Sequence, residues 1–319
     1  MSSMFSRRAV GYRASANAVR KRILQKILMT AILLTLLALI PAVYLNLRNG
    51  GGNVRRELRD HFESGDFELS YARSREILSE NPLDYYLLTV HGFSAYQLAV
   101  AQISSFDTLS FLEESIWSLR KAMLLRESPP EVHYMLGKAY YHKGPAYADL
   151  AVNYLEKARA ASFMAADIPE YLGLSYAAVR DYRSSIEAFT LALSGDYSRR
   201  VYPSDVLFLS IARSYMALEE YELSKAYLIR CIDISRDSKT ITTSRLLLAG
   251  IMLDAGDLEG AETEYLRILE EHGENAEAFF KLGEIFLSRG DTTRARAEWR
   301  RALRVDPAFR PARDRLNLS

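Results

Sequence analysis

The feature that most constrains this chain is a repeat of about 34 residues that runs from residue 51 to residue 309. Each unit predicts two antiparallel helices joined by a turn. One position of the second helix is small in every unit, where the residues are Ser70, Ser115, Ala151, Ser185, Ser224, Ala261 and Ala295. In six of the units the matching position of the first helix is also small, where the residues are Gly92, Gly137, Gly173, Ala212, Ala249 and Gly283; the terminal first unit has Leu58 there. A large side chain at either position would hold the helices apart, so the pattern predicts close helix crossings.

Glycine inside a helix is destabilising by about 1 kcal/mol relative to alanine. Its recurrence at the same position of successive repeats therefore indicates a packing role. The competing interpretation is an unrelated all-helical bundle in which small residues coincide by chance. A single motif would leave that interpretation open. Agreement in phase across about 260 residues argues against it.

The clearest unit is residues 276–309, whose characteristic residues are Leu282, Gly283, Phe286, Gly290, Asp291, Ala295, Trp299, Ala302 and Pro307. With these residues the unit resembles the tetratricopeptide repeat (TPR) family. The resemblance implies an all-α TPR solenoid of about seven helix-turn-helix repeats over residues 54–309. Residues 310–319 would then form a short capping helix or tail.

Two units depart from the regular length. The unit at residues 130–165 has a two-residue insertion around Gly144 and Pro145, which we place in the turn. The unit at residues 85–129 has an eleven-residue expansion, for which we expect an enlarged loop from Ala99 to Leu112.

The N-terminal segment has the composition of a membrane anchor. Residues 1–26 contain seven Lys and Arg side chains and no acidic one, and residues 27–47 are uncharged throughout. The second stretch is long enough to cross a hydrocarbon core, so we expect a transmembrane helix at 27–47 followed by a glycine-rich linker at 48–53. A cleaved signal peptide is disfavoured because the apolar stretch is long and ends without an Ala-x-Ala-like site. A mitochondrial presequence stays open, since the first 22 residues are rich in Arg, Ser and Ala.

The cations also predict an orientation. Seven precede the apolar stretch, and Arg48, Arg55, Arg56 and Arg59 follow it closely. Because Lys and Arg near a membrane are retained on the cytoplasmic side, we expect a single-pass protein with a cytoplasmic N-terminus. The repeats would be extracytoplasmic, and periplasmic if the membrane is a bacterial inner membrane.

The sequence contains no pattern typical of an active site. The five histidines are scattered without metal-ligand spacing, and no phosphate-binding glycine loop is present. The single cysteine, Cys231, lies at a helix-packing position and cannot form an internal disulfide. The balance of 41 basic against 40 acidic residues gives no overall field for nucleic acid. We therefore expect no enzyme activity, no metal, no cofactor, no small-molecule substrate and no nucleic-acid partner.

The resemblance also implies a partner-binding groove. In the TPR family, first-helix residues at the second, fifth, ninth and twelfth positions of each unit line the concave face. On this sequence the candidates are Tyr86, Phe93, Tyr96, Tyr134, Lys138, Tyr141, Leu209, Arg213, Met216, Leu246 and Phe280. Aromatic residues beside cations are typical of interaction hot spots, so we expect a protein partner bound as an apolar helix or extended segment. The alternative is that several of these tyrosines fill the solenoid interior.

Together these features favour a non-enzymatic, membrane-anchored scaffold or adaptor for protein–protein interactions in the assembly of a cell-envelope complex. Two alternatives stay open. One is a periplasmic chaperone-like module that binds clients transiently, and the other is an import or quality-control receptor on an organelle membrane.

Overall fold

The computed structural model describes residues 52–101, 105–125, 127, 129–163, 165–194 and 204–317. The predicted basic segment and the predicted transmembrane helix, residues 1–47, lie outside these ranges. Among the described residues, no helix combines the length and the apolar character needed to span a membrane. Within the same ranges the chain is all-α and contains no β-strand.

The chain divides into two compact units, one ending at Ser94 and the other running from Ala95 to Ser319. The boundary falls within helix α3 (Tyr85–Ala101). The first unit contains helical residues 52–63, helix α2 (Phe67–Glu80) and the start of α3. Buried hydroxyl groups connect α2 to α3 here, because Ser94 Oγ donates to Ser70 Oγ at 2.8 Å and Ser74 Oγ lies 2.9 Å from His91 Nδ1.

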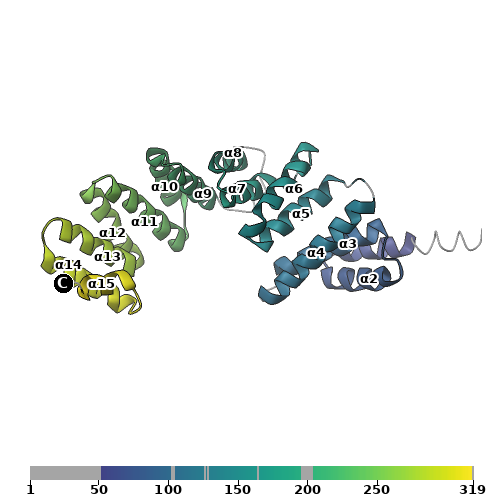
Figure 1. Ribbon diagram of the computed structural model, residues 1–319, viewed down its shortest axis with the longest axis horizontal. Helices are drawn as coiled ribbons and strands as arrows, with labels where there is room; N and C mark the ends of the chain where they lie inside the picture. Colours follow the sequence, from purple (N-terminus) through teal and green to yellow (C-terminus); the bar gives the residue numbers. More distant parts are fainter. Residues whose placement is uncertain are drawn as a thin grey trace, which may run out of the picture. The chain divides into compact units, whose positions relative to one another are not determined.

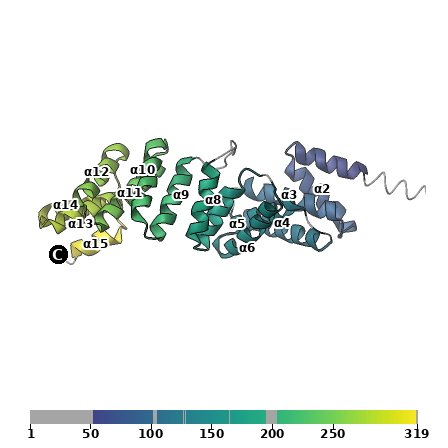
Figure 2. The same cartoon turned by 90° about the horizontal axis from the view of Figure 1, so that it is seen from above.

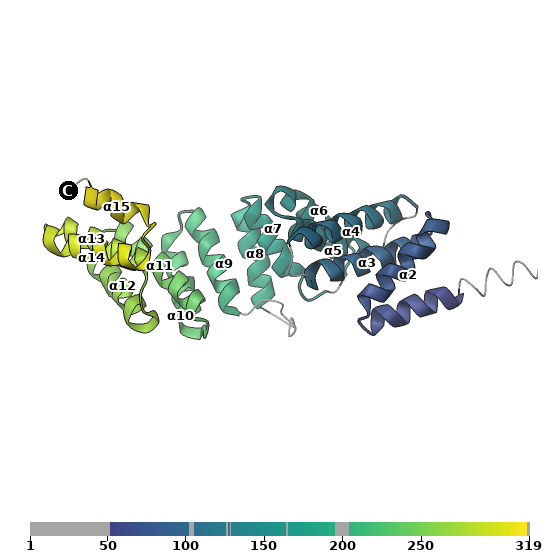
Figure 3. The same ribbon diagram turned by 90° about the horizontal axis from the view of Figure 1, so that it is seen from below.

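The second unit is a stack of helix pairs. Its helices after α3 are α4 (Ser105–Leu125), α5 (Pro130–Lys143), α6 (Ala148–Ala160), α7 (Ile168–Ala178), α8 (Tyr182–Leu193), α9 (Ser204–Ala217), α10 (Tyr221–Ile234), α11 (Ser238–Asp254), α12 (Leu258–His272), α13 (Ala276–Ser288), α14 (Thr292–Val305) and α15 (Arg310–Asn317). Within this unit the pairs follow one another in sequence order (Figures 1, 2 and 3). Each helix packs mainly against its neighbours in the chain, which is the arrangement of a TPR-like solenoid.

Glycine–aspartate pairs form the turns between the two helices of the α11–α12 pair and of the α13–α14 pair. Gly256 and Gly290 have φ values of 81° and 80°, a left-handed conformation that glycine adopts without strain. The following aspartates cap the second helix: Asp257 Oδ1 accepts the Gly260 N–H at 2.9 Å, and Asp291 Oδ1 accepts the Arg294 N–H at 2.9 Å. The bonds from Arg294 hold the pKa of Asp291 below its usual range.

The small residues at the helix crossings are fully buried, which confirms their predicted packing role. All seven second-helix positions have an exposed fraction of 0%. A Cβ on Gly137 would lie 2.5 Å from Leu155 Cγ, and a Cβ on Gly173 would lie 2.6 Å from the Phe189 ring. Where the crossing residue is serine, its hydroxyl can donate to the facing carbonyl, as Ser185 does to Gly173 at 2.8 Å.

The predicted loop from Ala99 to Leu112 is wrong. Helix α3 continues to Ala101 and α4 begins at Ser105, so most of the expansion is helical. Both Ala99 and Leu112 are buried, and tertiary burial of such positions stabilises additional helical turns. The shorter insertion does lie in a turn, where Gly144 adopts φ 120° before the 3₁₀ helix η1 (Pro145–Tyr147).

Candidate partner-binding surface

The two predicted groove residues of the first unit make contacts inside that unit. Tyr86 is half-buried, and its hydroxyl donates to the Arg55 carbonyl at 2.9 Å. The Arg55 guanidinium also lies 5.3 Å from the centre of the Tyr86 ring. The half-buried Phe93 ring lies 6.4 Å from the ring of Phe62. Neither side chain is fully buried.

Lys138 is enclosed by groups of its own unit. Its Nζ lies 2.7 Å from Asp167 Oδ2 and donates to the Tyr134 hydroxyl at 2.9 Å. The rings of Tyr171, Tyr134 and Tyr96 surround the ammonium group at 4.8, 4.9 and 5.6 Å from their centres. The side chains of Lys138 and Asp167 are only 13% and 7% exposed. The charge predicted to meet a partner is therefore neutralised within the fold.

The aromatic residues around this ion pair are also largely internal. Tyr96 is buried, and burial raises its pKa well above the usual range. Tyr134 donates its hydroxyl to Asp167 at 2.7 Å and packs its ring against Phe163. Burial, followed by the charge of Asp167, raises the pKa of Tyr134. These two tyrosines fill space between helices, as the alternative interpretation of the sequence allowed.

Tyr141 occupies the neighbouring turn of α5. Its half-buried ring meets the ring of Tyr171 edge to face at 5.1 Å. Beside it, His142 Nε2 lies 3.3 Å from the Tyr171 hydroxyl. His142 is partly exposed, but the adjacent rings of Tyr141 and Tyr171 desolvate its imidazole, and this desolvation together with the charge of Lys138 lowers the pKa of His142 to about 4.

The later candidates lie on α9, α11 and α13, and we call Leu209, Arg213, Met216, Leu246 and Phe280 the α9–α13 surface. Leu209 is buried in the core between α9, α10 and α11. Met216 and Leu246 are half-buried at the edges of successive core clusters. Arg213 is exposed and forms no ion pair within the described part of the chain. A cation beside half-buried aliphatic groups is thus available to a partner here.

The end of the chain partly covers the last member of that surface. The Phe280 ring meets the Phe309 ring edge to face at 5.7 Å. One turn later on α13, Glu284 accepts from Arg315 of α15, with Oε1 3.0 Å from Nε. Phe309 and Arg315 therefore leave less of α13 open to a partner than is open on α9 and α11.

Sequence reasoning missed Asp167, the residue that decides the environment of Lys138. Asp167 is not on a first helix at a groove position, because it immediately precedes α7. The period of the repeat contains no signal for such a residue. It also missed the buried cluster in which Arg245 pairs with Glu264 at 2.6 Å and with Glu271 at 3.1 Å, which ties α11 to α12.

The described residues offer no evident reactive centre. No group of three His, Cys, Asp or Glu side chains among them could hold a metal ion. Cys231 is buried, and its Sγ lies 3.2 Å from the Asp205 carbonyl and 3.2 Å from Ser244 Oγ. Burial raises the pKa of this thiol, which keeps it in the protonated form that is a poor nucleophile.

Comparisons with known proteins agree with the fold. The C-terminal part of a TPR repeat-containing protein from Cytophaga hutchinsonii is 14% identical with a TM-score of 0.59, covering 82% of this chain and 98% of that chain. PilF of Pseudomonas aeruginosa is 16% identical with a TM-score of 0.50, covering 72% of this chain and 97% of that chain. The comparison with curated proteins found no match. Two family models described as tetratricopeptide repeat match residues 207–238 and 246–311 of this chain.

Proposed function

We propose that this chain is a membrane-anchored, non-enzymatic scaffold that binds a protein partner through its α9–α13 surface and serves the assembly of a cell-envelope complex. The observation that carries the proposal is the exposed Arg213, which forms no ion pair with any described residue and lies beside half-buried aliphatic side chains on a stacked array of first helices. Such arrays present long continuous surfaces for binding other proteins.

The contrast between Lys138 and Arg213 supports the choice of the α9–α13 surface. Lys138 is held by Asp167 and three aromatic rings, so a partner would have to break a buried ion pair to reach its charge. Arg213 needs no such rearrangement. An apolar helix or extended segment with a carboxylate opposite Arg213 satisfies both the charge and the aliphatic contacts.

The sequence of the N-terminal segment supports the anchor. An uncharged stretch at residues 27–47 follows a basic segment at residues 1–26. A partner bound on the repeats would thereby be kept close to a membrane. A reporter that is active only outside the cytoplasm, fused after Ser319, tests the orientation; activity of a cytoplasmic reporter instead would reverse it.

The binding proposal is tested by gentle crosslinking in the native membrane followed by co-purification. We expect one stoichiometric partner with the wild-type chain, and at least about a tenfold loss of its capture with Arg213→Glu. Arg300→Glu is the matched control, because Arg300 is exposed on α14, a second helix. Equal capture by both variants would exclude the α9–α13 surface. Recovery of many weakly held clients would favour the chaperone-like alternative, and protease-accessible repeats on intact organelles would favour the receptor.

A further inference from the structure

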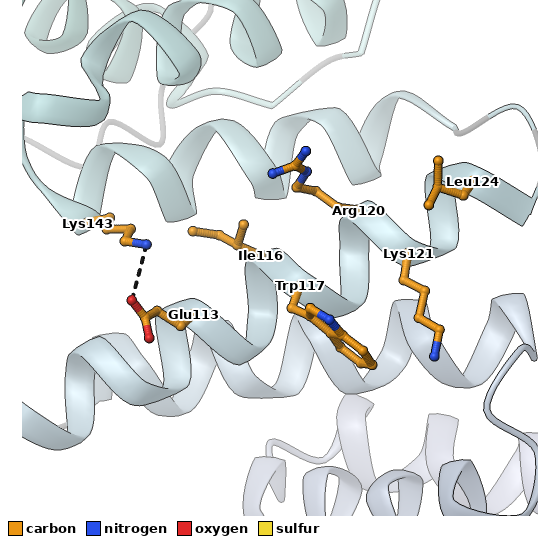
Figure 4. Close-up of a pocket in the computed structure, with 7 residues that line it drawn as sticks. All are labelled: Glu113, Ile116, Trp117, Arg120, Lys121, Leu124 and Lys143. Carbon is orange, nitrogen blue, oxygen red and sulfur yellow. Dashed lines mark ion pairs between the residues drawn. The ribbon is translucent and has the colours of Figure 1, made fainter.

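Helix α4 has apolar side chains in solvent that the TPR array does not need for its own packing. Trp117 is 59% exposed and Leu124 is 86% exposed. They border a cavity of about 560 Å³ together with the buried Ile116. Figure 4 shows that six of the labelled side chains lining this cavity come from α4 and that Lys143 comes from the end of α5. Single exposed apolar residues are ordinary on protein surfaces, but a tryptophan and a leucine around one hollow are typical of a binding site.

The charges around the hollow are mostly positive. Arg120, Lys121 and Lys143 line it, against one carboxylate, Glu113, which pairs with Lys143 at 3.3 Å. Lys121 Nζ lies 4.5 Å from the centre of the Trp117 ring. Arg120 is exposed and has no ion-pair partner in the described ranges of the chain. The hollow therefore presents two cations, Arg120 and Lys121, that no carboxylate of the described residues neutralises, next to an aromatic face.

This region, which we call the α4 surface (Ile116, Trp117, Arg120, Lys121 and Leu124), is separate from the α9–α13 surface. It lies on the second helix of its pair, whereas the groove positions of the family lie on first helices. A ligand here would leave the α9–α13 surface open.

We propose that the α4 surface binds an acidic, aliphatic segment of a partner protein. Carboxylates of the segment would pair with Arg120 and Lys121, and one large aliphatic or aromatic side chain would enter the hollow over Ile116 against Trp117. The hollow has the volume of sites that enclose small groups, and a buried aromatic anchor ringed by charges is the usual form of an interaction hot spot. A lipid surface offers no side chain shaped to enter the hollow over Ile116, whereas a partner segment with a large aliphatic or aromatic residue does.

Intrinsic fluorescence provides a direct assay, because the chain has two tryptophans and the other, Trp299, is buried. The probe is a dye-free synthetic peptide of alternating Glu, Asp, Leu and Phe, added to the purified full-length chain. We expect a saturable blue shift of the exposed Trp117 emission that weakens as salt is raised. The same peptide with lysine in place of its acidic residues should give no shift.

Variants assign the shift to the α4 surface. We expect Arg120→Glu combined with Lys121→Glu to raise the Kd at least about tenfold, while Arg300→Glu leaves it unchanged. Trp117→Ala, followed by fluorescence anisotropy of a labelled form of the peptide, should also raise the Kd at least about tenfold. Circular dichroism of each variant checks that the helices are intact.

Three results would overturn the proposal. They are the absence of any saturable shift with the acidic peptide, equal binding of the lysine peptide, and an unchanged Kd in the charge-reversal variant. Co-sedimentation of the chain with phosphatidylcholine–phosphatidylserine vesicles, lost on charge reversal and accompanied by no peptide binding, would assign the α4 surface to a membrane instead.

Discussion

Substituting Gly137 and Gly250 separates the effect of a close helix crossing on stability from the effect of helix propensity. Both lie inside first helices, α5 and α11. A Cβ on Gly137 would lie 2.5 Å from Leu155 Cγ, 2.9 Å from Leu155 Cδ2 and 3.0 Å from the Leu155 backbone nitrogen. A Cβ on Gly250 would meet no atom of the described residues within 4 Å. The substitution to alanine is chemically identical at the two positions and differs only in what the added methyl group meets.

The expected magnitudes follow from these distances. Replacing helical glycine by alanine stabilises by about 0.5 to 1 kcal/mol, which is the full effect expected at Gly250. Carbon atoms pack best at about 3.5 to 4.0 Å, so the methyl group at Gly137 requires a displacement of more than about 1 Å. Rotating Leu155 does not relieve the approach to its backbone nitrogen, so α5 and α6 must separate. Overpacking a core lowers the free energy of unfolding by about 1 to 3 kcal/mol, and the upper end applies here. After subtracting the gain in helix propensity, we expect Gly137→Ala to lower the free energy of unfolding by about 2 kcal/mol.

Urea unfolding followed by circular dichroism measures both effects. For an m-value of about 3 kcal/mol per molar, Gly137→Ala should lower the midpoint by about 0.7 M, and Gly250→Ala should raise it by about 0.2 to 0.3 M. Hydrogen exchange should place the loss in α5 and α6. A Gly137→Ala variant as stable as the wild type, or more stable, would refute the crossing argument. Destabilisation by Gly250→Ala would show that glycine in these helices serves something other than close packing.

Three further predictions concern the Lys138 cluster. Lys138→Met should destabilise by about 3 to 5 kcal/mol because it strands the buried Asp167 carboxylate, and adding Asp167→Asn should restore much of the urea midpoint. Tyr134→Ala combined with Tyr141→Ala should lower the melting temperature and cost several kcal/mol, since both rings pack internally. The pKa of His142 is about 4 in the folded chain against an ordinary 6.5, so its unfolded form binds a proton first as the pH falls. The contribution of His142 to the free energy of unfolding is therefore fully present above pH 6.5 and is lost as the pH falls towards 4. His142→Asn should flatten that loss in urea midpoints measured from pH 7 to pH 4.

The sequence was sufficient to predict the all-helical repeat array. Close helix crossing is a steric demand on a single position, and the demand recurs in every unit, so small residues such as Gly137 and Ala295 mark it without any knowledge of the partners. The Gly-Asp turns are equally local, because one residue supplies the left-handed conformation and the next caps the following helix.

The extent of the helices in the expanded unit was not predictable in the same way. A longer segment between two repeat motifs is compatible with a loop or with longer helices, and local sequence does not decide between them. The burial of Ala99 and Leu112 decides it, and those contacts come from the folded unit.

The same distinction between local sequence and tertiary contacts applies to the candidate site. Periodicity alone determined that Lys138 and Arg213 occupy corresponding positions on first helices, and the uncharged stretch at 27–47 alone predicts an anchor. Only the tertiary structure decided that Lys138 is buried against Asp167 while Arg213 stays exposed and unpaired among the described residues. The physical reason is that a helical position determines the direction of a side chain, whereas its charge environment depends on residues from other segments, here an aspartate 29 residues further along the chain.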